Sequence, residues 1–247
     1  MWCVARRTAA ALLVAAMGVT VAGQSSNGSK AIPRMPDGKP DFSGFWSLPY
    51  VPNMAASAAA EAAVPYTPEG LRAYRNHDAK DDPTSLCLYP GVPRIMQSPY
   101  PLQIVQTADQ LVMLFEYMGL WRAIPTDGRS HRQGIEPTFM GDSVGRWDGD
   151  TLVIDTTGLN DRTWLDTAGH QHSDAMHVVE RLRRTADTIV LEFTVDDPKM
   201  YSQPWKHERI IRPLPPIPGL PPLIEYSCNE NNRDLPHLVS FKPAADR

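Results

Sequence analysis

Three stretches of this chain repeat one pattern, in which a short turn containing aspartate leads into a run of aliphatic residues. The stretches read QTADQLVML, RWDGDTLVI and RTADTIVLE, and they begin at Gln106, Arg146 and Arg184. β-Rich runs on both sides of such turns are typical of β-hairpins. The pattern therefore predicts antiparallel strands. Its spacings of about 40 residues are too uneven for a propeller or a solenoid.

Further β-rich runs extend the pattern over most of the chain after Pro101. Gly44 and Trp46 open an earlier strand, and a tryptophan in that place resembles the one that closes the base of calycins, the lipocalin-type barrels. The sequence therefore predicts a mainly β fold, in which an antiparallel meander forms a curved sheet or a calycin-like barrel. The expected later strands are 102–106, 111–117, 120–124, 143–147, 151–156, 177–184, 188–195, 205–212 and 223–228.

The segment before these strands is expected to be mostly irregular. Residues 41–100 should form a first strand, one or two short helices and a proline-rich arm packed on the barrel. Thr67 is a suitable N-cap for a helix that has Pro68 at its first position, and the alanine-rich stretch 55–63 is a second helix candidate. The β domain should cover residues 101–240, with a tail at 241–247.

The first 23 residues have the pattern of a secretory signal peptide. Arg6 and Arg7 precede an apolar stretch from Ala9 to Val21, and a Val-Ala-Gly cleavage site precedes Gln24. So short an apolar run is typical of a cleaved signal and not of a membrane span. We therefore expect a periplasmic or secreted protein, in which residues 24–40 form a flexible linker.

The charge balance excludes some partners. The chain has a net charge of −4, which becomes −6 without the two arginines of the leader. An acidic chain without a basic stripe is not expected to bind nucleic acid or anionic lipid. A small-molecule ligand or substrate is the expected partner, and the sequence does not encode the oligomeric state.

Two cysteines, Cys87 and Cys228, remain after the leader. In an exported protein an even pair predicts a disulfide. In the chain-entropy model, closing so long a loop stabilises the fold by about 4–5 kcal/mol. The alternative is a redox or metal-binding thiol pair, which the absence of CxxC spacing disfavours.

Histidines and carboxylates are concentrated between Asn160 and Glu180. In an extended chain, His170, His172 and Asp174 project to one side, which is a plausible ligand set for Zn²⁺, Fe²⁺ or Cu²⁺. His177 would add a fourth ligand. A divalent metal ion is therefore the one cofactor that the sequence suggests. The alternative is a polar loop that leads into a strand.

The same region contains candidate catalytic groups. His172 or His177, oriented by Asp161 or by Asp166, would make a general base. Glu180 joins this set because strand alternation places it on the apolar side of 177–184, where a carboxylate needs a partner or carries a raised pKa. The alternative for Glu180 is an edge strand from which its side chain reaches water.

A third set of residues is expected to bind the substrate. Aromatic walls suit apolar or sugar ligands, and cationic groups at a barrel mouth suit anionic ones. Core packing and turn formation are the alternatives for each of these residues. The candidates are Tyr117, Trp121, His131, Arg146 and Trp164.

Several long motifs resemble a large family of exported bacterial proteins that occur in many copies in soil bacteria. The motifs are PDFSGFW from Pro40, IPTDGRSH from Ile124, GDSVGRW from Gly141 and HSDAMHVVER from His172. The resemblance covers Asp41 to about Leu238 and implies a secreted, strand-rich single domain. It supplies no catalytic residues.

Three functions are consistent with these patterns. The first is a lyase, isomerase or hydrolase that acts on a small molecule by acid–base or metal-assisted chemistry. The second is a non-catalytic calycin-like module that binds a ligand. The third is an extracellular structural or interaction protein that uses the proline-rich bridge 213–222 and the N-terminal arm.

Overall fold

A computed structural model describes residues 30–56 and 63–228 of the chain. The sheet belongs to the unit that begins at Ala31. The leader, most of the second helix candidate and the tail lie outside the described residues. Among the described helices, none has the length and hydrophobicity that a membrane crossing requires.

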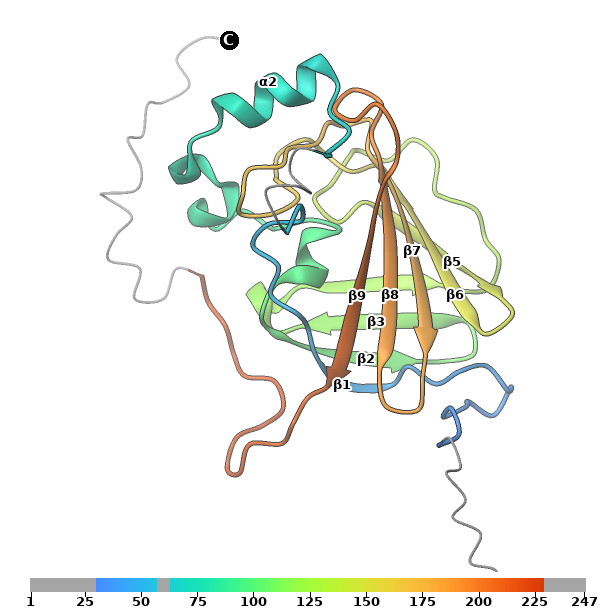
Figure 1. Ribbon diagram of the computed structural model, residues 1–247. Coiled ribbons are helices and arrows are strands. Elements are labelled where there is room, and N and C mark those ends of the chain that lie inside the picture. Colours follow the sequence, from blue (N-terminus) through green and yellow to red (C-terminus); the bar gives the residue numbers. More distant parts are fainter. Residues whose placement is uncertain (1–29, 57–62, 229–247) are drawn as a thin grey trace, which may run out of the picture. The chain divides into compact units, whose positions relative to one another are not determined.

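The fold is a single antiparallel sheet of nine strands. Their order is β4-β3-β2-β1-β9-β8-β7-β6-β5. Strands that follow one another in the chain are hydrogen-bonded neighbours, except at one place, and β9 returns to pair with β1 (Figure 1). The strands are β1 (Gly44–Ser47), β2 (Pro101–Gln106), β3 (Gln110–Phe115), β4 (Trp121–Pro125), β5 (Asp142–Asp148), β6 (Thr151–Thr157), β7 (His177–Arg184), β8 (Ile189–Asp196) and β9 (Trp205–Pro213).

The exception is the junction between β4 and β5, where the sheet does not close by a ladder. Every hydrogen-bonded strand pair in the sheet is antiparallel. With β1 next to β9, alternating directions around the sheet give β4 and β5 the same sense. A hairpin cannot join strands of the same sense, so residues 126–141 form a long crossover instead. We call this junction the seam.

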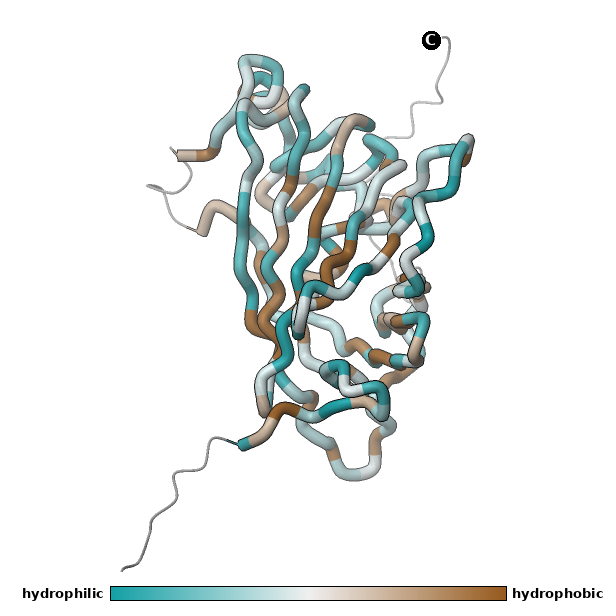
Figure 2. The backbone as a smooth tube through the Cα atoms, turned by 90° about the vertical axis from the view of Figure 1, so that its right-hand side faces the viewer, coloured by the Kyte–Doolittle hydropathy of each residue, from teal (hydrophilic) through white to brown (hydrophobic). Residues whose placement is uncertain are grey.

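Strand alternation fixes the core. On β8, Ile189, Leu191, Phe193 and Val195 are fully buried, while the residues between them are partly exposed. The register carries this inward row to Leu182 and Val178 on β7 and onward around the sheet. Figure 2 shows hydrophobic segments along the central strands. The predicted antiparallel meander and curved, nearly closed barrel-shaped sheet are therefore confirmed.

One end of the strands is covered by helices and loops. Helix α2 (Pro68–Asn76) begins as expected, with the Thr67 hydroxyl accepting a hydrogen bond from Gly70 N. It lies at the same end of β7, β8 and β9 as the loop from β6 (Figure 1). Three short 3₁₀ helices lie in the arm, namely η1 (Ala79–Asp81), η2 (Pro83–Leu86) and η3 (Arg94–Gln97), and a fourth, η4 (Tyr117–Gly119), joins β3 to β4. All four residues of η3 are buried.

Trp46 has the predicted buried position in the first strand. Its indole is 3% exposed, and its Nε1 donates a hydrogen bond to the Phe42 carbonyl at 2.9 Å. The Arg184 guanidinium lies 4.8 Å from the indole ring centroid. Because Arg184 ends β7, this contact connects the first strand to the far side of the sheet.

The predicted disulfide is confirmed, and one predicted strand is wrong. Cys87 and Cys228 are bonded, with their Cα atoms 5.7 Å apart. Residues 223–228 form no strand. The segment cannot pair with β1, because β1 already has β9 and β2 on its two edges. The Ile224 N–H, which a ladder would use, donates to the Glu116 carboxylate instead.

Candidate functional site

The predicted metal ligands do not come together. The His170 Nδ1 lies 2.6 Å from Asp166 Oδ2, and both side chains are fully buried. His172 is buried apart from it, with Nδ1 at 3.1 Å from the Ser173 carbonyl oxygen. Asp174 is exposed and pairs with Lys199. In the parts of the chain that the structure describes, no three His, Cys, Asp or Glu side chains are grouped to hold a metal ion.

The four predicted catalytic groups lie in different environments. Asp161 is exposed in the loop after β6. His172 is buried, and burial lowers its pKa, so its imidazole is held neutral. Glu180 points into the barrel, whereas His177 points outward from the same strand. The alternation predicted for 177–184 is therefore confirmed, and it separates the side chains that an acid–base mechanism needs together.

Glu180 has the partner that its burial requires. Arg122 of β4 crosses the barrel interior to it, with Nη2 2.6 Å and Nη1 3.2 Å from the two carboxylate oxygens. Arg122 Nη2 also donates to the hydroxyls of Ser143 and Thr156. The Arg122 side chain thus spans the seam from β4 to β5, β6 and β7. Its own Nε is buried and has no hydrogen-bond partner among the described atoms.

His177 belongs to a second cluster, on the outer face of β5, β6 and β7. Asp155 Oδ1 lies 3.0 Å from His177 Nε2 and 2.9 Å from Nε2 of His131, a residue of the crossover. The other ring nitrogen of His131 lies 3.0 Å from Asp142 Oδ2. Carboxylates only accept hydrogen bonds, so His131 can donate to both of them only as a doubly protonated imidazolium.

The pKa of His131 agrees with that protonation state. Partial burial lowers its pKa, but the hydrogen bonds to Asp155 and Asp142 outweigh this effect and hold the pKa above its ordinary value. Asp142 also accepts from the backbone N and the Nε of Arg132. The cluster therefore ties the crossover to the barrel wall.

Two adjoining hollows, of about 450 and 340 Å³, lie along the seam. We call them together the seam cleft. They share five lining residues, which come from β4, the crossover and β5: Trp121, Ala123, Arg132, Asp142 and Ser143. The larger hollow reaches Arg122. The cleft exists because no ladder draws β4 and β5 together at this level.

The two ends of the seam cleft differ in chemistry. One end is lined by the apolar side chains of Tyr89, Met118, Leu120 and Met140. The other end carries Arg129, Ser130 and Gln110. Trp121, common to both hollows, is 64% exposed although it is the largest apolar side chain there.

Arg132, which lines both hollows of the seam cleft, has a cationic group that a ligand can reach. Its side chain is 70% exposed. Its Nε is bonded to Asp142, and its two terminal nitrogens make no hydrogen bond to any described residue. A guanidinium held in this way presents N–H groups in a fixed orientation.

Of the predicted substrate-binding residues, the structure places Trp121 in the seam cleft and His131 beside it. Arg146 is exposed on the outer side of β5. Trp164 is buried and meets the His77 ring edge-on. Tyr117 lines a separate hollow of about 210 Å³ with Arg94 and Tyr100, and burial raises the pKa of its phenol.

Sequence reasoning missed Arg122 and Asp155. A signal for Arg122 was present, because Leu120, Arg122 and Ile124 alternate in a short strand and share one face. The face that buries Leu120 and Ile124 also buries Arg122, and a buried cation needs a carboxylate. The contributions of Asp142 and Asp155 depend on how the crossover folds, and no local pattern reveals that.

Comparison with known proteins adds little to this description. No family model and no curated protein matches the chain. Two similar solved structures are crystal structures of mutants of the fluorescent protein UnaG. They are 14% and 13% identical to this chain, cover 70% of it and 95% of their own chains, and have TM-scores of 0.33 and 0.32. Scores this low carry no argument, so the barrel assignment is based on the strand order and register.

Proposed function

We propose that this protein is a ligand-binding barrel that holds a small amphipathic anion in the seam cleft. The observation that carries the proposal is Trp121, a tryptophan left largely in water on the wall of a concave site. An exposed indole loses the free energy that burial of its surface would supply. A ligand that stacks on it recovers that free energy.

The two ends of the cleft indicate the ligand's shape. The apolar end accommodates a flat or branched hydrocarbon group against Met118 and Met140. The free guanidinium nitrogens of Arg132 suit a carboxylate or sulfonate. The ligand is therefore expected to carry its charge beside the indole and its apolar body beyond it.

Catalysis is not part of this proposal. The acid–base hypothesis needs His172 or His177 oriented by Asp161, Asp166 or Glu180. His172 instead has the Ser173 carbonyl as its hydrogen-bond partner, and His177 pairs with Asp155 on the outer face of the barrel. A binding function needs only the cleft.

A titration with 1-anilinonaphthalene-8-sulfonate, an aromatic anion, tests the proposal. Binding should quench Trp121 fluorescence, and Trp121→Ala should weaken it about tenfold, in line with the loss of one aromatic contact. Arg132→Gln should also weaken binding of the anion, but not binding of a neutral naphthalene. Ile210→Ala, an exposed apolar residue on β9, is the matched control. Equal affinity in the wild type, Trp121→Ala and Arg132→Gln proteins would contradict the proposal.

We also propose that the protein works outside the cytoplasm, as a member of the exported bacterial family that its motifs resemble. The disulfide is compatible with an oxidising compartment. Expression in a bacterial host followed by cell fractionation and N-terminal sequencing tests this proposal. A processed protein that begins at Gln24 is expected, and an unprocessed cytoplasmic protein would contradict it.

A further inference from the structure

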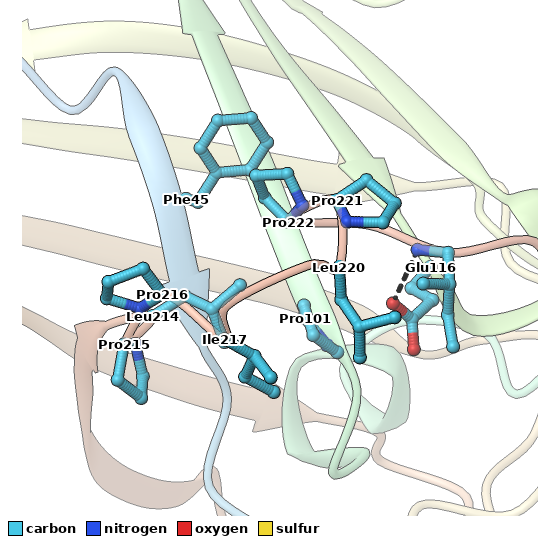
Figure 3. Close-up of a pocket in the computed structure, with 11 residues that line it drawn as sticks. Phe45, Pro101, Glu116, Leu214, Pro215, Pro216, Ile217, Leu220, Pro221 and Pro222 are labelled. Atoms are coloured by element: carbon cyan, nitrogen blue, oxygen red, sulfur yellow. Dashed lines mark hydrogen bonds between the residues drawn. The ribbon is translucent and has the colours of Figure 1, made fainter.

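The proline-rich segment after β9 forms an arch over the outer side of β1 and β2. It is held at one end by the Leu214 N–H, which donates to the Phe45 carbonyl at 3.0 Å. At the other end, the Ile224 N–H donates to Glu116 Oε2, also at 3.0 Å. Figure 3 shows the residues between these anchors arranged around a hollow. We call residues 214–224 the proline arch.

The composition of the arch prevents it from collapsing onto the sheet. Proline has a fixed φ and no N–H, so this segment can neither bend freely nor add a ladder to the strands below. A turn at its top, closed by the Leu220 N–H on the Ile217 carbonyl, reverses the chain. The five prolines of the arch are Pro215, Pro216, Pro218, Pro221 and Pro222.

The hollow under the arch has a volume of about 310 Å³, and its lining is apolar except at one point. Phe45 and Pro101 form its floor, and Leu214, Ile217 and Leu220 form its sides. Glu116 is the one ionisable side chain in the lining. One of its oxygens holds Ile224, and the other makes no hydrogen bond to any described residue.

We propose that this hollow is a binding site for a hydrophobic cation, with an ammonium group beside Glu116 and an alkyl or aryl body under the proline arch. The apolar side chains around the hollow are unusually exposed, with Ile217 at 61% and Leu220 at 57%. A ligand body that covers them removes apolar surface from water. The single carboxylate then selects a cation over an anion of the same shape. The site is separate from the seam cleft and does not depend on its function.

Isothermal titration with octylammonium, octanol and octanoate tests the proposal, because the three share one chain and differ in charge. Octylammonium should bind most tightly and octanoate least. Glu116→Gln keeps an oxygen for the Ile224 N–H and should weaken octylammonium binding about fivefold, the size of a partly exposed charge pair, without changing octanol binding. Glu136→Gln, which removes an exposed carboxylate elsewhere, is the control.

A second variant keeps the test decisive if Glu116→Gln disturbs the arch. Ile217→Ser changes an exposed side chain and should weaken octylammonium and octanol alike. The proposal is overturned if all three molecules bind equally, or if neither variant alters binding. It is also overturned if sedimentation shows a dimer that Ile217→Ser dissociates, because the occupant of the apolar surface would then be a second copy of the chain.

Discussion

Arg122 on β4 and Glu180 on β7 form an ion pair inside the barrel, with both side chains almost completely removed from water. The pair lies across the seam, where β4 and β5 share no ladder. Arg122 therefore supplies, through its side chain, a connection that the backbone does not make at this place.

Removing one partner of this pair should be strongly destabilising. Glu180→Leu or Arg122→Met leaves an uncompensated buried charge, and we expect the free energy of unfolding to fall by about 3–5 kcal/mol. Urea denaturation followed by circular dichroism measures the change. The double variant Arg122→Met, Glu180→Leu buries no charge and should recover much of the loss. A double variant as unstable as the sum of the single ones would show that the two residues do not act as a pair.

Stability should depend on pH through His131. The folded pKa of this residue lies above the unfolded value of about 6.5, so the folded state binds the proton more tightly. Its contribution is fully present below pH ~6.5 and is lost as the pH rises through the folded pKa. The stability difference between wild type and His131→Asn should therefore be larger at pH 5.5 than at pH 9. A difference that is constant over this range would show that His131 is not held as an imidazolium.

His207 on β9 should produce the opposite dependence. Burial, together with neighbouring Arg209, lowers the pKa of His207 to about 3, so the folded state excludes a proton that the unfolded state binds below pH ~6.5. Its contribution is present above that pH and is lost as the pH falls towards the folded pKa. Replacing it by phenylalanine, beside Phe193, should make thermal stability less sensitive to acid between pH 6.5 and 4. Lys206→Gln, at the exposed neighbouring position, should leave the acid sensitivity as it is in wild type.

The close approach of strands at the seam depends on Gly145. A β-carbon built there would lie 2.9 Å from Thr126 Cγ2 and 3.3 Å from Ile124 Cγ2. We expect Gly145→Val to lower the free energy of unfolding by about 1–3 kcal/mol, as overpacked cores do. Adding Thr126→Ser removes one of the atoms it meets and should restore part of the loss. If Gly145→Val melts at the wild-type temperature, β5 can move away from β4 without cost.

The strands could be predicted because their signals are local. Asp-containing turns and alternating side chains define β5 to β9 to within a residue or two of the observed bounds, and the Cys87–Cys228 bond follows from counting cysteines. The strand expected at 223–228 was wrong because β propensity is local, whereas a strand also needs a neighbour with a free edge, and both edges of β1 are occupied.

The candidate site could not be predicted in the same way, because its residues meet only after the sheet curves. Trp121 and Asp142 are brought together by a crossover whose path no local pattern encodes. In contrast, the composition of the histidine-rich loop predicted metal ligands and catalytic groups. In the structure, His170 is buried against Asp166 and His172 against backbone, so these imidazoles serve the packing of the loop.

The seam, where β4 and β5 share no backbone hydrogen bonds, also determines how a bound ligand would affect the stability of the protein. Elsewhere around the barrel, neighbouring strands are joined by repeated amide–carbonyl bonds, and a bound molecule can add little to them. At the seam, a ligand would contact β4 and β5 at the same time. Ligand binding would then raise the free energy of unfolding, and the ligand-bound protein would be more stable than the free protein.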